Sequence, residues 1–421
     1  MTSQIILINQ EGIAVASDTM TTAGRKAMPV ASKIYEVGGE HRVCVLHSGR
    51  VEIGGVAMST LIREWAAQLK VPFMALSDYV SDFDKWLLTG LSKFNVSEKN
   101  SIEAVIKAEF SDYLHYGDFD DIFHDHEFMA SLQDENGEAL EDAEDRLTER
   151  VANTLAGYGE KYFKKAPKYE DLDAEKTARM IRNEDIDLAE IFRQVVHSHS
   201  DGELSDFPVN ETLLNSLRGF AAELLCHRVI ANETATLNFV GFGLNEPIGG
   251  NIRVDIRGIY GNHLRGRIQQ RNPKSSGDLG VTIIPVAQRE AMDFLVDGLN
   301  DRTIRAIQRE IHCVFRELGI EPIDKLENFE DVFVKHLKEL LHDEVNHPVR
   351  ETISSLNVGA LARYADSLIR MESLRASSER SVTSVGGAIE VVTITRWQTP
   401  SVQWHRKLDS GIERDSRLSQ I

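Results

Sequence analysis

The first eighteen residues hold two apolar runs on either side of a short turn that contains a glycine. The runs are residues 2–8 and 13–18, and the turn between them ends in Gly12. Two such runs predict a β-hairpin. This feature narrows the choice of fold most, because it starts the chain with an antiparallel sheet. It also brings Asp18, at the end of the second strand, back to the start of the first.

Two further strands are expected at residues 31–37 and 42–46, with Gly38 and Gly39 in the turn between them. Together with the hairpin they predict a four-stranded antiparallel meander. Apolar side chains then recur at helical spacing over residues 56–69, which predicts a helix.

Thr2 lies directly after Met1, and an aminopeptidase can remove a methionine that precedes so small a side chain. The exposed threonine would then carry a hydroxyl nucleophile and an α-amine base on one residue. An unperturbed α-amine titrates at about 8, against about 10.4 for a lysine. A neighbouring cation such as Lys33 would lower its pKa further. Taken alone, Thr2 could simply start an edge strand, Asp18 could cap a turn and Lys33 could protect a sheet edge.

The combination of these residues is more specific than any one of them. Thr2, the glycine-turn hairpin, Ala16-Ser17-Asp18, Thr22, Lys33-Ile34 and the small turn Ser48-Gly49 before a helix resemble the proteasome β-subunit superfamily. That superfamily includes the bacterial HslV peptidase and the Anbu proteins. The spacing from threonine to aspartate is the same, and that from threonine to lysine is one residue shorter. The Anbu proteins look most similar, because they too start directly after methionine.

The resemblance returns in later segments, and together these cover roughly half of the chain. Residues 236–243 and 251–259 look like strands of the second sheet, and residues 283–295 look like the helix after them. Residues 384–395 resemble the late strand of the superfamily, followed by a turn around Pro400 and a last strand at 402–406.

The resemblance implies an α+β fold, a four-layer αββα sandwich of two antiparallel sheets typical of N-terminal nucleophile hydrolases. Residues 1–100 and 213–421 would form this core, with extra helices at about 301–345. Residues 101–212, which shift towards Asp and Glu, would form an acidic helical insertion. This insertion could close an antechamber, dock a partner, buttress a ring or simply cap the core.

The resemblance also implies roles for the three central residues. Thr2 Oγ would attack a scissile carbonyl, and its α-amine would move the proton. Lys33 would lower the pKa of both groups, and Asp18 would hold Lys33 charged and oriented, as the acid of a triad does.

Substrate contacts follow from the same resemblance. Backbone N–H groups of a turn within residues 45–49, at Leu46 or Gly49, would hold the oxyanion. Thr22 would pair with the substrate backbone as an added strand. The late loop departs from the superfamily pattern, since valines stand where an aspartate and a serine are usual. Three nearby residues could substitute for these two: Ser381, Thr383 and Ser384.

The formal net charge of −19 argues against binding to nucleic acid or to an anionic membrane surface. The sequence shows neither a membrane-spanning apolar stretch nor a signal peptide. Cys44, Cys226 and Cys313 lie in apolar surroundings without a paired motif, so we expect three buried thiols. A reducing, cytoplasmic location fits these features.

We predict neither a metal site nor a cofactor. Asp134-Glu-Asn-Gly137 lacks the first and last ligands of a calcium loop, and the pairs His124/His126 and His197/His199 lack further ligands at a recognisable spacing.

The leading functional hypothesis is a threonine peptidase that cleaves peptides or unfolded proteins inside a homo-oligomer, either a ring or an open helix. An ATPase unfoldase could supply the substrate in trans. Two alternatives stay open. One is a catalytically inactive scaffold similar to the proteasome α-subunits, and the other is an amidohydrolase of small amides built on the same fold.

Overall fold

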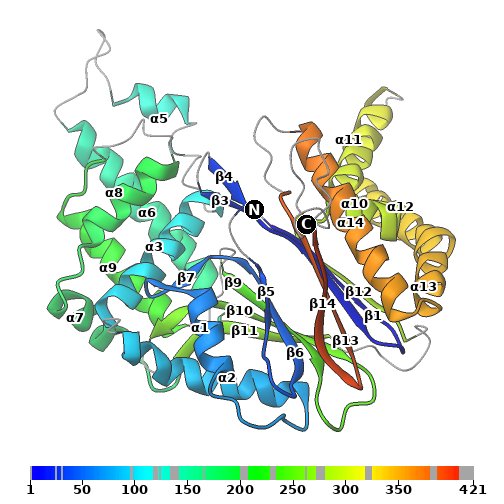
Figure 1. Cartoon of the computed structure of the whole chain (residues 1–421). Helices are drawn as coiled ribbons and strands as arrows, with labels where there is room; N and C mark the ends of the chain where they lie inside the picture. Colours follow the sequence, from blue (N-terminus) through cyan, green and yellow to red (C-terminus); the bar gives the residue numbers. More distant parts are fainter. Residues whose placement is uncertain are drawn as a thin grey trace.

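A computed structural model describes residues 2–23, 26–29, 32–94, 98–116, 122, 125–132, 142–164, 166–199, 207–227, 234–260, 263–271, 280–317, 325–379 and 386–406. These residues form a mixed α/β structure with two five-stranded antiparallel sheets and helices outside both (Figure 1).

The first sheet contains the first and the last strand of the described residues. Its strands, in spatial order, are β12 (Thr282–Ala287), β1 (Ser3–Ile8), β2 (Ile13–Asp18), β13 (Ile389–Thr395) and β14 (Gln398–Arg406). The predicted hairpin is confirmed, since Ile5 lies opposite Ala16 in an antiparallel ladder. Both β1 and β2 are interior strands of this sheet, and both are buried along their whole length.

The second sheet has the order β11 (His263–Arg271), β10 (Gly250–Tyr260), β9 (Ala235–Phe242), β6 (Arg42–Gly49) and β5 (Ile34–Glu36). The predicted four-stranded meander is therefore wrong, because β5 and β6 pair in a different sheet from β1 and β2. A small hairpin of β3 (Met20–Ala23) and β4 (Lys26–Pro29) lies between them in the chain. The flanks of β2 are already taken by β1 and β13, which leaves no edge for β5.

The two sheets face each other across an apolar cluster to which both contribute. The side chains of β1 alternate between the two faces of the first sheet. Ile6 and Ile8 belong to this cluster, whereas Ile5 and Leu7 pack against the helices. The second sheet contributes Cys44, Leu46, Val240 and Phe242 to the same cluster.

Helices cover the outer face of each sheet (Figure 1). The second sheet packs on α1 (Met58–Ala66) and α2 (Leu76–Gly90), around Trp65 and Phe83. The first sheet packs on α14 (Val358–Glu379), which contributes Leu361 and Ile369. Short elements complete these regions: β7 (Glu52–Ile53), β8 (Val56–Ala57), η1 (Leu91–Phe94), α10 (Glu290–Asp297) and α13 (His347–Ser354).

A third apolar cluster lies within the helices that cover the edge of the second sheet. It is built from α3 (Glu98–Tyr116), α6 (Ala143–Phe163), α7 (Ala174–Asn183), α8 (Leu188–His199) and α9 (Glu211–Cys226). A short helix, α5 (His126–Ala130), lies in the same region of the sequence. The cluster joins the predicted insertion to α9, and Tyr260 of β10 also belongs to it. The predicted domain boundaries stay a prediction.

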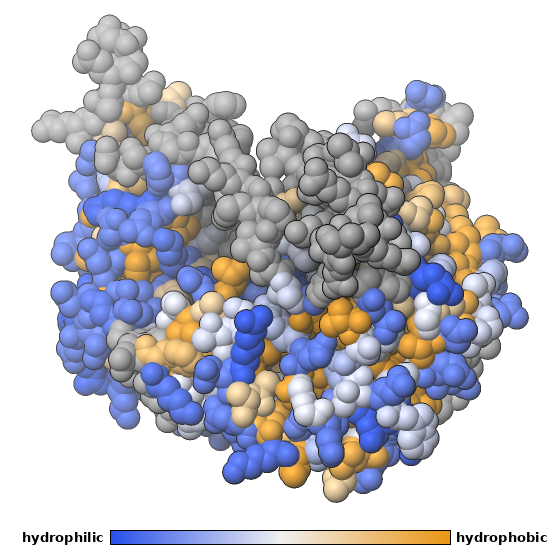
Figure 2. Space-filling view, in the orientation of Figure 1, coloured by the Kyte–Doolittle hydropathy of each residue, from blue (hydrophilic) through white to orange (hydrophobic). Residues whose placement is uncertain are grey.

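Further helices lie on the side of the first sheet, where the sequence predicted extra ones. They are α11 (Asp301–Glu317), α12 (Lys325–Leu341) and a π-helical turn, η2 (His342–Asn346). Hydrophilic residues predominate over the side of α7 and α9, whereas apolar residues gather on the side of α12 and α13 (Figure 2). Within the described residues no helix is long and apolar enough to cross a membrane.

Three further expectations from the sequence are wrong. Residues 283–295 do not form one helix, because residues up to Ala287 pair with β1 as strand β12 and only then does α10 begin. The turn expected around Pro400 lies earlier, since Pro400 is inside β14. Cys313 is exposed on α11, whereas Cys44 and Cys226 are buried as predicted.

Candidate active site

The structure brings Asp18 and Lys33 into contact at one end of the facing sheets. Asp18 is the last residue of β2 in the first sheet, and Lys33 directly precedes β5 in the second. Lys33 Nζ lies 2.9 Å from Asp18 Oδ1. The exposed fractions are 0% for Asp18 and 6% for Lys33, so this ion pair is removed from water and links the two sheets.

The Asp18 carboxylate also binds two backbone N–H groups from distant parts of the chain. Ser3 N donates to Oδ1 at 2.9 Å, and Gly386 N donates to Oδ2 at 3.3 Å. Lys33 Nζ donates a second hydrogen bond to the Met20 carbonyl. The carboxylate thus fixes the start of β1, the segment before β13 and the lysine relative to one another.

Burial shifts the pKa of both members of the pair. It lowers the pKa of Lys33, and the attraction of Asp18 offsets this in part. It raises the pKa of Asp18, against the opposing effects of Lys33 and of the Ser3 and Gly386 N–H groups. Burial thus disfavours the charge on each partner, and the charge of each partner favours that of the other.

Thr2 lies next to this pair, directly before β1. Its carbonyl accepts a hydrogen bond of 2.9 Å from Gln288 N. Side chains alternate along a strand, so Thr2 shares the inward face of β1 with Gln4 and Ile6. The adjacent Ser3 N–H is already bound to Asp18. The threonine is half-buried at the end of the sheet where the ion pair is located.

Other polar contacts join the two sheets at the same end. Gln4 Nε2 donates to the His47 carbonyl at 2.9 Å, and Ser32 Oγ donates to Glu390 Oε2 at 2.7 Å. His47 binds the Arg50 carbonyl through Nε2 at 2.7 Å, and its pKa is lowered, mainly by burial.

Leu46 and Gly49 differ in whether they could present an N–H group to a reacting carbonyl. Leu46 lies inside β6, paired with Ile34 and Asn238, and its side chain is fully buried between the sheets. The sequence predicted that Leu46 lies in a turn, and this prediction is wrong, because Leu46 lies inside the strand. Gly49 ends β6 with φ +80°, and Arg50 follows it out of the strand.

The direction of the N–H groups along β6 also favours Gly49. His47 N donates to the Lys33 carbonyl at 2.9 Å. N–H groups two residues apart on a strand point the same way, so that of Gly49 points to the side of Lys33. Gly49 is thus the better oxyanion donor of the two predicted positions.

The remaining predicted residues are placed as follows. Thr22 lies in β3 opposite Ala27. Ser381, Thr383 and Ser384 lie outside the described residues. Sequence reasoning missed Gln288 and Gly386, whose backbone groups contact Thr2 and Asp18. A hydrogen bond from a distant backbone group leaves no mark on residue type, although Gly386 lies within residues 384–395, which resemble the late strand of the superfamily.

The described residues contain no group of three or more His, Cys, Asp or Glu side chains placed to hold a metal ion. What the candidate site offers is a hydroxyl, a buried amine, a carboxylate and backbone donors. These are the components of acyl transfer through a hydroxyl nucleophile.

Two comparisons with known proteins gave no match. No protein-family model matches the chain, and no curated protein is significantly similar to it.

Proposed function

We propose that this protein is an N-terminal threonine hydrolase that cleaves peptide bonds. The nucleophile is Thr2, exposed by removal of Met1, and the proposal includes the four-layer αββα arrangement of N-terminal nucleophile hydrolases. The observation that carries it is the buried Asp18–Lys33 pair, 2.9 Å apart, whose carboxylate also holds the backbone of Ser3 next to Thr2.

In the proposed reaction Thr2 Oγ attacks the scissile carbonyl while the Thr2 α-amine takes the hydroxyl proton. The C–N bond then breaks as the proton passes to the leaving amine, which leaves an acyl ester on Thr2. Water hydrolyses the ester with the same amine as base. Lys33 lowers the pKa of the amine and the hydroxyl through its charge, and Gly49 N–H stabilises the oxyanion.

The alternative of small amides as substrates uses the same residues. The proposal favours peptides because β3 begins at Met20, whose carbonyl Lys33 binds, and a strand at this place can pair with an extended chain. Assembly into a homo-oligomer in the cytoplasm, with an unfoldase in trans, belongs to the same proposal.

The experiment is intact-mass and peptide mapping of the purified protein after treatment with a peptide epoxyketone. This reagent closes a ring with both the threonine hydroxyl and the free α-amine. We expect a mass without Met1 and one adduct on the peptide that begins with Thr2. The variant Thr2→Ala should lose the adduct, and the variant Thr2→Ser should keep it.

Each other outcome contradicts part of the proposal. Retention of Met1 blocks the amine in an amide and would favour the inactive scaffold. Removal of Met1 without an adduct would point to a closed site. Adduct formation together with cleavage of small amides but not of peptides would favour the amidohydrolase.

A further inference from the structure

Gln288 makes two hydrogen bonds to the start of β1. Gln288 N donates to the Thr2 carbonyl at 2.9 Å, and Ser3 Oγ donates to the Gln288 carbonyl at 3.0 Å. The position of Thr2 along the strand therefore depends on the position of the Gln288 backbone.

The backbone around Gln288 is not in a relaxed conformation. Ala287, the last residue of β12, has φ +64°, in the left-handed region that residues with a Cβ rarely adopt. Such a residue keeps its conformation only where the surroundings impose it. The turn between β12 and α10 therefore needs a restraint from outside itself.

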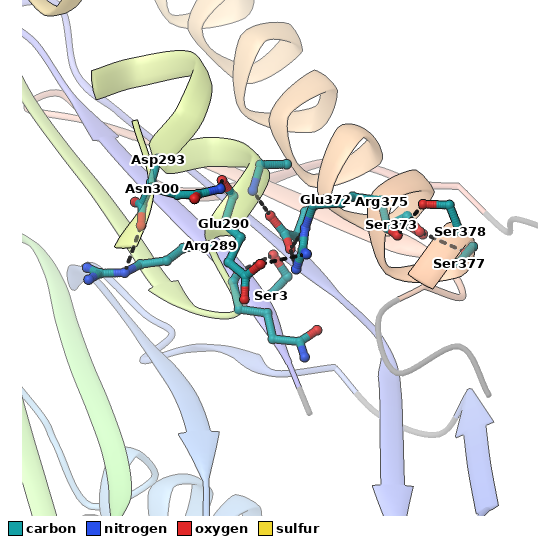
Figure 3. Close-up of polar contacts among 12 residues, drawn as sticks. Ser3, Arg289, Glu290, Asp293, Asn300, Glu372, Ser373, Arg375, Ser377 and Ser378 are labelled. Carbon is teal, nitrogen blue, oxygen red and sulfur yellow. Dashed lines mark hydrogen bonds and ion pairs between the residues drawn. The ribbon is translucent and has the colours of Figure 1, made fainter. Parts of the chain in front are cut away.

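Glu372 of α14 contacts the first turn of α10, which follows this backbone directly (Figure 3). Its side chain is fully buried, and Oε2 accepts a hydrogen bond of 2.8 Å from Ala291 N in the first turn of α10. Its other oxygen, Oε1, accepts two hydrogen bonds from Arg375, at 3.0 and 2.8 Å. Arg375 in turn binds Glu290 Oε2 at 2.8 Å. A carboxylate at a helix N-terminus is favourable, and its pairing with Arg375 offsets the cost of burial.

We propose that Glu372 is a positioning residue for Thr2: it fixes the first turn of α10, which fixes Gln288, which holds the Thr2–Ser3 peptide. This rests on the proposed function in so far as Thr2 is the nucleophile. The link reaches the site from the opposite side to Asp18, which holds the Ser3 N–H. Thr2 is thus restrained by one carboxylate on each side, Asp18 directly and Glu372 through the turn.

The test compares Glu372→Gln with Asp366→Asn. Asp366 is the matched control, because it lies on the same helix as Glu372 and forms an ion pair with Arg370, at 2.8 Å. Labelling of Thr2 is followed with a peptide epoxyketone at several concentrations, which separates the maximal rate from the affinity. Hydrogen–deuterium exchange of the same three proteins is followed in peptides that cover residues 2–8 and 287–295.

We expect Glu372→Gln to lower the maximal labelling rate by about tenfold or more, because small displacements of a reacting group are costly. The affinity for the reagent should stay unchanged. Exchange should become faster in both peptides, and Asp366→Asn should leave the rate and the exchange as in the wild type.

Two results overturn the positioning role. One is unchanged exchange in the peptide of residues 2–8 in Glu372→Gln. The other is faster exchange throughout the protein, which would show a general loss of stability. Failure of the wild type to be labelled would instead contradict the proposed function, and the exchange data would still decide whether Glu372 positions Thr2.

Discussion

The two ends of the space between the sheets are built from different side chains. At one end Ile8, Ile13 and Ile394 pack in an apolar cluster. At the other end β1 presents Gln4 and β2 presents Ser17, whose hydroxyl lies 3.3 Å from Gln4 Nε2. Each of these inward faces thus changes from apolar to polar along a single strand.

This difference separates two physical roles of one interface. The apolar end stabilises the pairing of the sheets without depending on direction, because burial of apolar surface scales with area. The polar end contributes little net stability, because the cost of desolvating its charges offsets their attraction. It does fix the relative positions of the groups that it joins. We therefore expect substitutions at the apolar end to change stability alone, and those at the polar end to change reactivity as well.

The largest effect is expected for Lys33→Met, which leaves the fully buried Asp18 without its cation. The free energy of unfolding should fall by about 3 to 5 kcal/mol, as measured by urea denaturation. Labelling of Thr2 should also be lost. The double variant Asp18→Asn/Lys33→Met should regain most of the stability and none of the labelling. If the double variant were as unstable as Lys33→Met, the buried charge would not be the cause.

The corresponding change at the apolar end is Ile6→Ala. Ile6 is fully buried between the sheets, so the loss of its side chain should cost about 2 to 5 kcal/mol in the same denaturation experiment. The folded variant should be labelled at the wild-type rate. A labelling rate that fell in parallel with stability would show that the two ends of the interface are not independent.

A smaller effect is expected for Gly49→Ala at the end of β6. An added Cβ would lie 2.1 Å from the Thr234 carbonyl oxygen, and φ is +80°. We expect a loss of about 1 to 3 kcal/mol in the free energy of unfolding, from the clash and the left-handed backbone together.

Gly55→Ala is the control for that prediction. Gly55 has φ +79° and no atom within 4 Å of an added Cβ, so it reports the backbone cost alone. Equal losses in the two variants would show that the contact of Gly49 with Thr234 does not constrain the end of β6.

The smallest effect concerns pH. Because burial lowers the pKa of His47 from its usual 6.5, the unfolded chain binds a proton more readily than the folded one. The stability that depends on neutral His47 is thus present above about pH 6.5 and decreases as the pH falls towards the folded-state pKa. Melting temperatures of wild type and His47→Asn, measured between pH 7 and 5, should converge on acidification. Parallel curves would contradict this sign.

The sequence was sufficient to predict the parts of the fold that depend on local pattern. The two apolar runs and the glycine turn of residues 2–18 predicted β1 and β2, and helical spacing over residues 56–69 predicted α1 close to its observed position. Asp18 and Lys33 were identified as candidates from the resemblance, because their residue types match the superfamily pattern and their spacing from Thr2 matches it to within one residue.

Other features could not be predicted from the sequence, because they depend on contacts between distant residues. Whether β5 joins the sheet of β2 depends on β13, more than 350 residues later, which occupies that edge of β2. The resemblance predicts a helix over residues 283–295, and the short apolar run of β12 could not correct it because such a run fits either period. Glu372 resembled any helical glutamate, and only packing shows that its carboxylate is buried against α10.

The contacts of Asp18 have a consequence for the order in which the molecule is made. Its carboxylate is held by groups from residues 3, 33 and 386, and β2 is completed on its far side by β13. A chain emerging from a ribosome must therefore expose its residues as far as β13 before the Asp18–Lys33 pair can leave water. Pairing over so great a separation is also slow, since the closure of a long loop precedes it. The candidate site is thus among the last parts of the molecule to form, and a truncated nascent chain would not contain it.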